Sequence, residues 1–146
     1  MNGIITFPDE RLQYVSHKEE WQIFTIHVES TSLEAKCPYC GEMSKRVHSR
    51  YLRKLQDLPI QGKKVRLIIE NKKYFCFNND CGHKTFAEPF LFFKPKATKT
   101  TRLQEEILRV SLTQSSVSAA TYLKRSVADV GKSTICNLLK KTRRDD

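Results

Sequence analysis

Two pairs of cysteines constrain this chain more than any other feature of its sequence. Cys37 and Cys40 flank a Pro-Tyr dipeptide, and Cys76 and Cys81 are separated by four residues. A tetrahedral zinc ion takes four thiolate or imidazole ligands, and two short loops that each offer two thiolates meet that requirement. We therefore expect one Zn²⁺ ion held by Cys37, Cys40, Cys76 and Cys81. Four thiolates leave no open position for a reacting water, so the ion should be structural.

Other interpretations of these cysteines are weaker. Cys-Pro-Tyr-Cys is also the active-site pattern of glutaredoxins, whose first thiol is a nucleophile at a helix N-terminus. Here the second cysteine is followed by the helix breaker Gly41, no apolar stripe follows, and the chain lacks the βαβ pattern of that fold. Gly41 suits a metal loop, because a residue without Cβ lets N–H groups turn toward the sulfurs. His83 is an alternative ligand, and Cys136, remote from both pairs, is expected to pack as a small apolar residue.

Length and hydropathy favour a small intracellular protein. The 146 residues allow one domain or two small ones, and small domains often need a metal to fold. No apolar run approaches the roughly 18 residues of a membrane span, and the N-terminus does not resemble a secretory signal. We therefore expect a cytoplasmic location, without a membrane or a small-molecule substrate.

Charge is distributed unevenly along the chain. The formal net charge is +10, yet residues 1–35 carry −4, residues 36–73 carry +8 and residues 94–146 carry +7. The two basic blocks coincide with the cysteine region and with a helical region, as phosphate contacts would require. Double-stranded DNA is therefore the expected partner, and a solvated basic surface without a partner is the alternative.

Residues 1–93 are expected to form a β module. Residues 21–28 and 65–77 have strand-type composition, and each segment leads toward one cysteine pair. Residues 57–62 between them contain Pro59 and Gly62 and predict a turn. We expect short strands around the metal, with a hydrophobic cluster covering the sheet: Phe86, Phe90, Leu91, Phe92 and Phe93.

Residues 94–100 are polar and basic and are expected to be a linker to a helical unit over residues 101–146. Thr101 and Gln104 fit a capping box, followed by an apolar face of Leu103, Ile107, Leu108 and Leu112. A second helix is predicted over 116–124, with Val117, Ala120 and Leu123 buried. A third is predicted over 132–141, with Val130, Ile135 and Leu139 facing the core. The expected fold class is α+β: a small zinc-stapled β module followed by a three-helix helix-turn-helix unit.

The third helix would enter the major groove of DNA. Asn can pair with adenine edges, Ser and Thr can reach bases or phosphates, and Lys can reach phosphate or guanine. The candidate contacts on this helix are Lys132, Ser133, Thr134, Asn137 and Lys141. A second set follows the first cysteine pair and could clamp phosphate: Arg46, Arg50, Arg53 and Lys54. His48, in the same stretch, is expected to be packed or solvated.

The order of these features resembles the N-terminal region of ISL-type bacterial insertion-sequence transposases. The resemblance runs from about residue 20 to 142 and includes Cys-Pro-x-Cys-Gly at 37–41, Val-His-Ser-Arg-Tyr at 47–51, Leu-Gln-Asp-Leu-Pro-Ile-Gln-Gly at 55–62, Tyr-Phe-Cys-Phe-Asn at 74–78 and Phe-Ala-Glu at 86–88. It implies a zinc finger and a helix-turn-helix that read the terminal inverted repeats of the element. It also implies that the four cysteines are the zinc ligands and that residues 132–141 are the recognition helix.

The chain departs from that family in one respect. Family transposases continue into a catalytic domain whose acidic residues hold two metal ions, whereas this sequence ends at Asp146 without a comparable carboxylate set. We therefore expect a non-enzymatic protein, either a truncated transposase or a stand-alone regulator, with a homodimer or a full-length transposase as a possible assembly.

Two functions of other classes remain open at this point. The first is a zinc-ribbon adaptor whose basic surface binds an acidic protein, which would show only weak affinity for random DNA at low salt. The second is a single-stranded nucleic-acid binder that stacks bases on aromatic side chains: Tyr51, Tyr74, Phe75 and Phe77.

Overall fold

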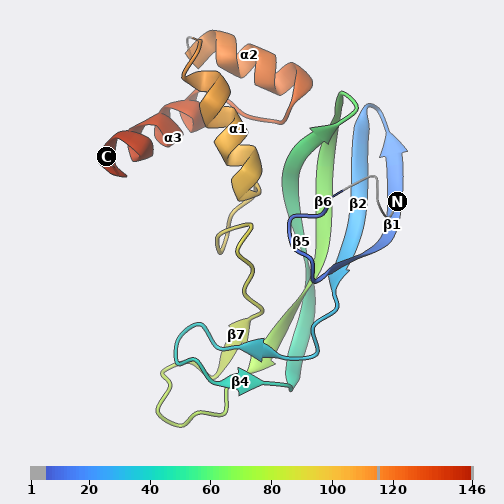
Figure 1. The fold of residues 1–146 in the computed structure, drawn as a ribbon, viewed down its shortest axis with the longest axis vertical. Helices are drawn as coiled ribbons and strands as arrows, with labels where there is room; N and C mark the ends of the chain where they lie inside the picture. Colours follow the sequence, from blue (N-terminus) through green and yellow to red (C-terminus); the bar gives the residue numbers. More distant parts are fainter. Residues whose placement is uncertain (1–5, 115, 146) are drawn as a thin grey trace.

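The computed structural model describes residues 6–114 and 116–145 and has a mixed α+β fold (Figure 1). A sheet-rich N-terminal part carries the cysteine cluster, and three helices follow it, which confirms the expected fold class. The strands are β1 (Leu12–Glu20), β2 (Ile23–Ser30), β3 (Ala35–Lys36), β4 (Met43–Ser44), β5 (Val47–Ile60), β6 (Lys63–Phe75) and β7 (Thr85–Ala87). The helices are α1 (Thr101–Ser111), α2 (Ser116–Ser126) and α3 (Lys132–Asp145).

The main sheet consists of two hairpins joined by a parallel strand pair. Its order is β1-β2-β6-β5, with β2 parallel to β6 and the other pairs antiparallel, and β7 pairs with the end of β6. The expectation of short strands is confirmed for β3, β4 and β7, which have two or three residues, but it is wrong for β5, which has 14, and β6, which has 13. Figure 1 shows these two strands continuing past β1 and β2 to the end of the molecule where β4 and β7 lie. They therefore connect the cysteine cluster with the helical end.

Both hairpins turn through two residues that have positive φ. The angles are 53° at Trp21 and 65° at Gln22 in the first turn, and 50° at Gln61 and 78° at Gly62 in the second. Two successive positive φ values define a type I′ turn, whose twist matches that of the strands it joins. The turn expected over residues 57–62 is thus confined to residues 61 and 62. Residues 57–60 belong to β5, where the register shifts between Asp57 and Ile60.

One face of the sheet is covered by the segment after β7. Phe90, Phe92 and Phe93 are buried there against side chains such as Val28, Leu55, Val65, Leu67 and Ile69. Two members of the expected aromatic cover behave differently. Leu91 is 98% exposed. Phe86 packs beside the cysteines with Ala35 and Tyr74 instead.

The three helices enclose a separate core. Leu103, Ile107, Ala119, Leu123 and Ile135 are fully buried in it. The first helix is capped one residue earlier than expected, since the side chain of Thr100 accepts a hydrogen bond from the N–H of Leu103. Leu112 and Val117, both expected to be buried, are exposed, because the helices turn Val110 and Ala119 inward in their place. The second and third helices also run further than expected, to Ser126 and Asp145.

The segment expected to be a linker lies against β5. The N–H of Gln56 donates to the carbonyl of Thr98 at 2.8 Å, and the N–H of Thr100 donates to the carbonyl of Gln56 at 3.0 Å. The turn between α2 and α3 reaches the same strand, where the Asp129 N–H donates to Oε1 of Gln56 at 2.7 Å. The Asp129 carboxylate also pairs with Lys64 of the neighbouring β6 at 3.0 Å. The start of the helical unit and its turn between α2 and α3 are therefore both attached to the sheet.

Candidate metal centre and nucleic-acid surface

The first cysteine loop is closed by backbone hydrogen bonds between β3 and β4. The N–H of Gly41 donates to the carbonyl of Cys37, and the N–H of Cys37 donates to the carbonyl of Glu42, both at 2.9 Å. Gly41 has a φ of 84°, a value that glycine adopts without the strain of a Cβ. The role expected for this glycine is therefore confirmed, and the loop holds Cys37 and Cys40 on one side.

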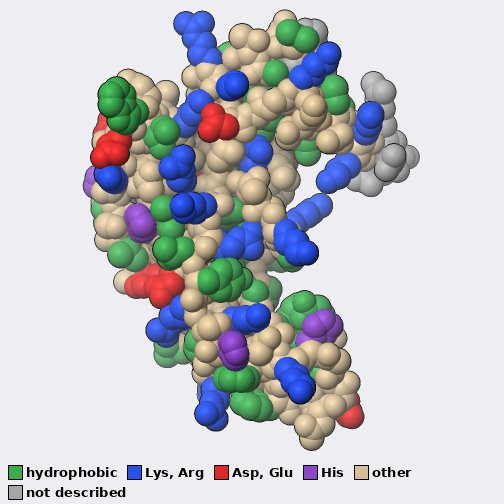
Figure 2. All heavy atoms as spheres, turned by 180° about the vertical axis from the view of Figure 1, so that it is seen from behind, with side chains coloured by type: hydrophobic (Ala, Val, Ile, Leu, Met, Phe, Trp, Pro, Cys, Tyr) green, Lys and Arg blue, Asp and Glu red, His purple; other side chains and the backbone are tan. Residues whose placement is uncertain are grey.

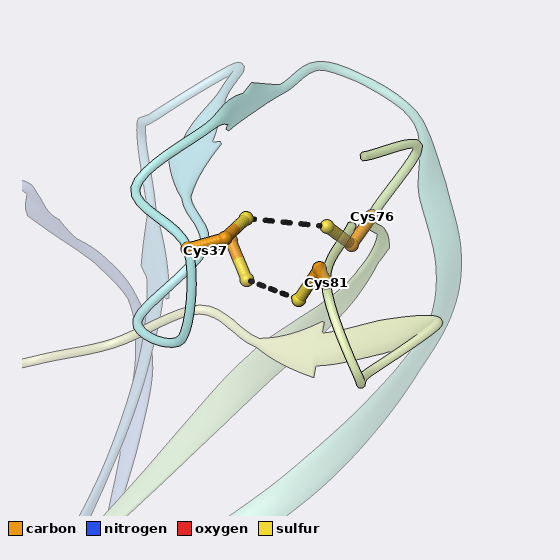
Figure 3. Close-up of side chains that lie close together, drawn as sticks. Cys37, Cys76 and Cys81 are labelled. Carbon is orange, nitrogen blue, oxygen red and sulfur yellow. Dashed lines mark hydrogen bonds between the residues drawn. The ribbon is translucent and has the colours of Figure 1, made fainter. Parts of the chain in front are cut away.

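The second cysteine loop joins β6 to β7. The N–H of Cys76 donates to the carbonyl of Lys84 at 2.8 Å, and the N–H of Cys81 donates to the carbonyl of Asn78 at 3.0 Å. These bonds bring Cys76 and Cys81 to the same side of the loop. Figure 3 shows both side chains pointing across to the first loop, where Cys81 meets Cys37 and Cys76 meets Cys40.

The four sulfur atoms form a compact group. Their mutual distances are all within 4.8 Å, with 4.0 Å between the Sγ atoms of Cys37 and Cys81 and 3.6 Å between those of Cys40 and Cys76. Zinc–sulfur bonds of about 2.3 Å in a tetrahedron separate sulfurs by about 3.8 Å, so the spacing fits this ion. Cys37 is buried and the other three are partly buried. His83 is not in the group, and its ring stacks on Tyr39 with the ring centroids 3.5 Å apart.

Backbone N–H groups aimed at the sulfurs adjust the acidity of the thiols. The N–H of Glu42, together with the Asn78 side chain and neighbouring thiols, lowers the pKa of Cys40 to about 7. At Cys76 the N–H of Asn78 also lowers the pKa, but burial and hydrogen bonds from the other thiols outweigh it and raise the pKa to about 12. The pKa of Cys81 is raised as well, where burial and its contacts with Cys40 and Cys37 exceed the effect of the His83 N–H. A negative charge on one sulfur thus makes ionisation of the neighbouring thiols less favourable. A bound dication removes this effect.

These features define a closed Cys₄ zinc ribbon. The chain binds one structural Zn²⁺ through Cys37, Cys40, Cys76 and Cys81, and these ligands pack with Ala35, Val47, Tyr74 and Phe86. The ion therefore holds together two loops that have a small core of their own.

Comparison with known proteins agrees with this site. Residues 34–81 match the family model described as the zinc-finger of transposase IS204/IS1001/IS1096/IS1165. The match spans both cysteine pairs and about a third of the chain, and it supports a nucleic-acid-binding or transposase-related role. No curated protein and no solved structure matches the chain. Within the described residues, no helix is long and apolar enough to cross a membrane.

The candidate DNA contacts of the third helix lie mainly on its outer side. Lys132, Ser133, Asn137 and Lys141 are exposed, and Thr134 is partly buried. Ile135, between them in sequence, is fully buried in the helical core. Residues 132–141 thus carry polar side chains outward while an apolar side chain anchors the helix.

The basic residues of β5, and Arg46 just before it, differ in the direction of their side chains. Arg46, Arg50 and Lys54 are exposed. Arg53 instead points to the covered face, where its guanidinium lies 5.1 Å from the Phe93 ring centroid and donates to the carbonyl of Ala97 at 2.8 Å. Arg53 therefore already holds the segment after Phe93 in place, and a role for this residue in DNA contact stays a prediction.

The aromatic residues proposed for base stacking also differ in how far their side chains are exposed to solvent. Tyr74 is fully buried and cannot stack on a base. Phe77 is 65% exposed and stacks with Phe75, whose ring also meets the edge of His48. His48 is thus packed against an aromatic ring while remaining exposed, so it combines the two environments expected for it.

Sequence reasoning missed the residues between the two modules. Lys94 and Lys96 fall in the segment expected to be a linker, yet both line a groove beside α1 and α3. The signal was present in Lys94-Pro95-Lys96, because a proline favours the second position of a β-turn. The roles of Gln56 and Asp57 had no comparable local signal.

Proposed function

We propose that this protein binds duplex DNA in a sequence-dependent way through its zinc ribbon and its C-terminal helix-turn-helix. The observation that carries the proposal is the combination, in one chain, of a transposase-type zinc finger with a helix whose exposed residues can contact DNA. Asn137 would read a base edge, and Lys132, Ser133, Thr134 and Lys141 would contact bases or phosphates around it. Arg46, Arg50 and Lys54 would add phosphate contacts from the zinc-ribbon side, with Arg53 supporting that surface.

The target would be the terminal inverted repeat of an insertion element or an operator. In the first case the protein would act with a full-length transposase, and in the second it would act as a regulator, alone or as a homodimer. Neither role requires this chain to break a DNA strand, so we propose a binding protein and not an enzyme. Its place would then be the bacterial cytoplasm, on the nucleoid.

A selection experiment tests the proposal directly. Zinc-loaded protein is incubated with a random duplex library, and the recovered sequences are measured again at two salt concentrations and after chelation. We expect a defined motif that persists at the higher salt concentration and is lost when zinc is removed, because base contacts survive screening better than phosphate contacts do. Binding without a motif, which weakens steadily as salt rises, would contradict the proposal and favour the acidic-protein adaptor.

One observation favours a second candidate, the binding of single-stranded nucleic acid. Phe77 is exposed beside Phe75, and the guanidinium of Arg46 lies 5.9 Å from the Phe75 ring centroid. Exposed aromatic rings beside a cation can stack bases of any sequence. This candidate requires preference for single strands and loss of binding in Phe77→Ala, whereas the main proposal requires loss in Asn137→Ala.

A further inference from the structure

A groove of about 500 Å³ lies where the segment after Phe93 passes the helices. Its walls come from α1, α3 and residues 94–97, and Lys94, Lys96 and Lys141 all line it. Glu105 is the acidic residue among its lining side chains, which also include Leu108 and Leu138. The groove thus has three lysines from two separate elements and one carboxylate.

A second hollow of about 310 Å³ lies on the zinc-ribbon side of the same segment. Pro38 and Tyr39 from the first cysteine loop line it, together with Tyr51 of β5. Pro95 and Lys96 border both hollows. The turn that carries these residues therefore stands between the zinc ribbon and the helices. Figure 2 shows Lys and Arg side chains along the recess between these two parts.

In the turn formed by residues 94–97, the third position is occupied by Lys96, a residue that is unfavourable there. The N–H of Ala97 donates to the carbonyl of Lys94 at 3.0 Å, and Lys96 has a φ of 65°. A type II turn requires positive φ at this third position, where glycine or asparagine is favoured. A lysine there stores backbone strain, which points to a use for its side chain. Lys94 and Lys96 are exposed, and no ion pair joins them to the described acidic side chains.

We propose that the Lys94–Ala97 turn is a third phosphate-binding element, which contacts the backbone of duplex DNA between the zinc ribbon and α3. This inference rests on the proposed function and specifies how the DNA would lie, along the recess and across both modules. Lysine ammonium groups contact phosphate as point charges without reading bases, so this element would add affinity to every sequence equally.

The attachment of the helical unit to the sheet fixes the zinc ribbon, the turn and α3 as one surface before DNA binds. Gln56 hydrogen-bonds to Thr98, Thr100 and Asp129, so the turn and the helices are held at fixed positions relative to β5. Contacts in a preorganised surface need little additional ordering when DNA binds. The turn therefore serves as part of the binding surface and not as a flexible tether.

Substitutions in the turn, measured on preferred and random duplexes, test the inference. Lys96→Gln should weaken binding to both duplexes by the same factor and reduce the slope of log K against log salt by about 0.9, and Lys94→Gln/Lys96→Gln by about twice that. Lys18→Gln is the matched control, because Lys18 is an exposed lysine of β1, which lies at the opposite edge of the sheet from β5. It should leave the slope unchanged. Lys96→Gly should melt at the same temperature as the wild type or higher, because glycine relieves the strain, yet should show the same loss of slope.

The outcomes separate this inference from the function on which it rests. Lys96 variants with the wild-type salt slope, in a protein that still loses its sequence preference on Asn137→Ala, would overturn the inference alone. A Lys96→Gly protein that melts at a lower temperature and keeps the wild-type slope would also overturn it, since the lysine would then be structural. A wild-type protein that binds no duplex would overturn both.

Discussion

Arg102 at the start of α1 forms a two-pronged ion pair with Asp57 of β5. Its Nη2 lies 2.5 Å from Oδ2 and its Nε 2.8 Å from Oδ1, while the hydroxyl of Thr100 also donates to Oδ1 at 2.8 Å. The hydrogen bonds that Arg102 donates to Asp57 raise the pKa of the guanidinium. Asp57 is only 3% exposed, so these donors replace the water that an exposed carboxylate would contact. This carboxylate joins the sheet to the first helix.

Asp57→Asn should therefore weaken the attachment of the helical unit. The amide keeps the volume of the side chain but leaves the Arg102 guanidinium without its counter-charge, and we expect a loss of about 2–3 kcal/mol in the free energy of unfolding. Urea unfolding followed by circular dichroism measures it. Asp80→Asn is the control, because Asp80 is exposed in the second cysteine loop. Equal stability of Asp57→Asn and wild type would show that the ion pair does not hold the helix.

Cys76→Ser should lower the zinc content and unfold the ribbon. A serine hydroxyl is a poor zinc ligand, and the two loops have little other core to hold them together. Metal analysis measures the zinc content, and thermal melting measures the unfolding. Cys136→Ser, which changes a cysteine of α3 remote in sequence from the metal ligands, should keep its zinc. A Cys76→Ser protein with full zinc and a cooperative melt would remove Cys76 from the ligand set.

The affinity for zinc should fall as the pH falls. Without metal, the pKa of Cys76 is raised to about 12 and that of Cys81 is also raised, so both thiols carry protons near neutral pH. Zinc binds thiolates and must release these protons, which acid opposes, so we expect a loss of at least about tenfold per pH unit near neutrality. Competition with a chromophoric chelator at several pH values measures this. An affinity independent of pH would mean that the thiols are already ionised.

Asn137→Ala should reduce sequence preference more than general affinity. Loss of a bidentate contact with a base typically costs about 1–3 kcal/mol on the preferred sequence and little on random DNA. Lys132→Gln supplies the contrast, because a lost phosphate contact should weaken binding to both duplexes equally. Fluorescence anisotropy titrations with the two duplexes distinguish these patterns. Equal losses for Asn137→Ala on both duplexes would argue against base reading by this residue.

The metal site could be predicted from the sequence because its requirements are local. Two cysteines on each short loop, with Gly41 to turn the first, specify ligands almost independently of the remaining chain. The three helices were also predictable, since each has apolar residues three or four positions apart: Leu103 and Ile107, Ala120 and Leu123, and Ile135 and Leu139. Helix ends and the buried faces were less accurate, because Val110 and Ala119 compete with Leu112 and Val117 for the same core.

The sheet was harder to predict, because its strands depend on their partners. The second half of β1, from Ser16 to Glu20, is polar and exposed and has no strand pattern of its own; pairing with β2 keeps it extended. The charged residues of β5 concealed a long strand, and without that strand the opposite directions of Arg53 and Lys54 could not be inferred. The parallel pairing of β2 with β6 joins residues about forty positions apart and left no signal in either segment.

The hydrogen bonds of Gln56 also bear on how such a protein can evolve. A helix-turn-helix on a loose tether can be exchanged between proteins by recombination, because its new neighbour needs no matching surface. Here Gln56 contacts the backbone before α1 and the turn before α3, and Lys64 pairs with the same turn. A substituted helical half would need its own partners for residues 56, 57 and 64. If α3 reads DNA as proposed, new specificity should therefore arise by substitutions on its outer face, within a pair of modules that are inherited together.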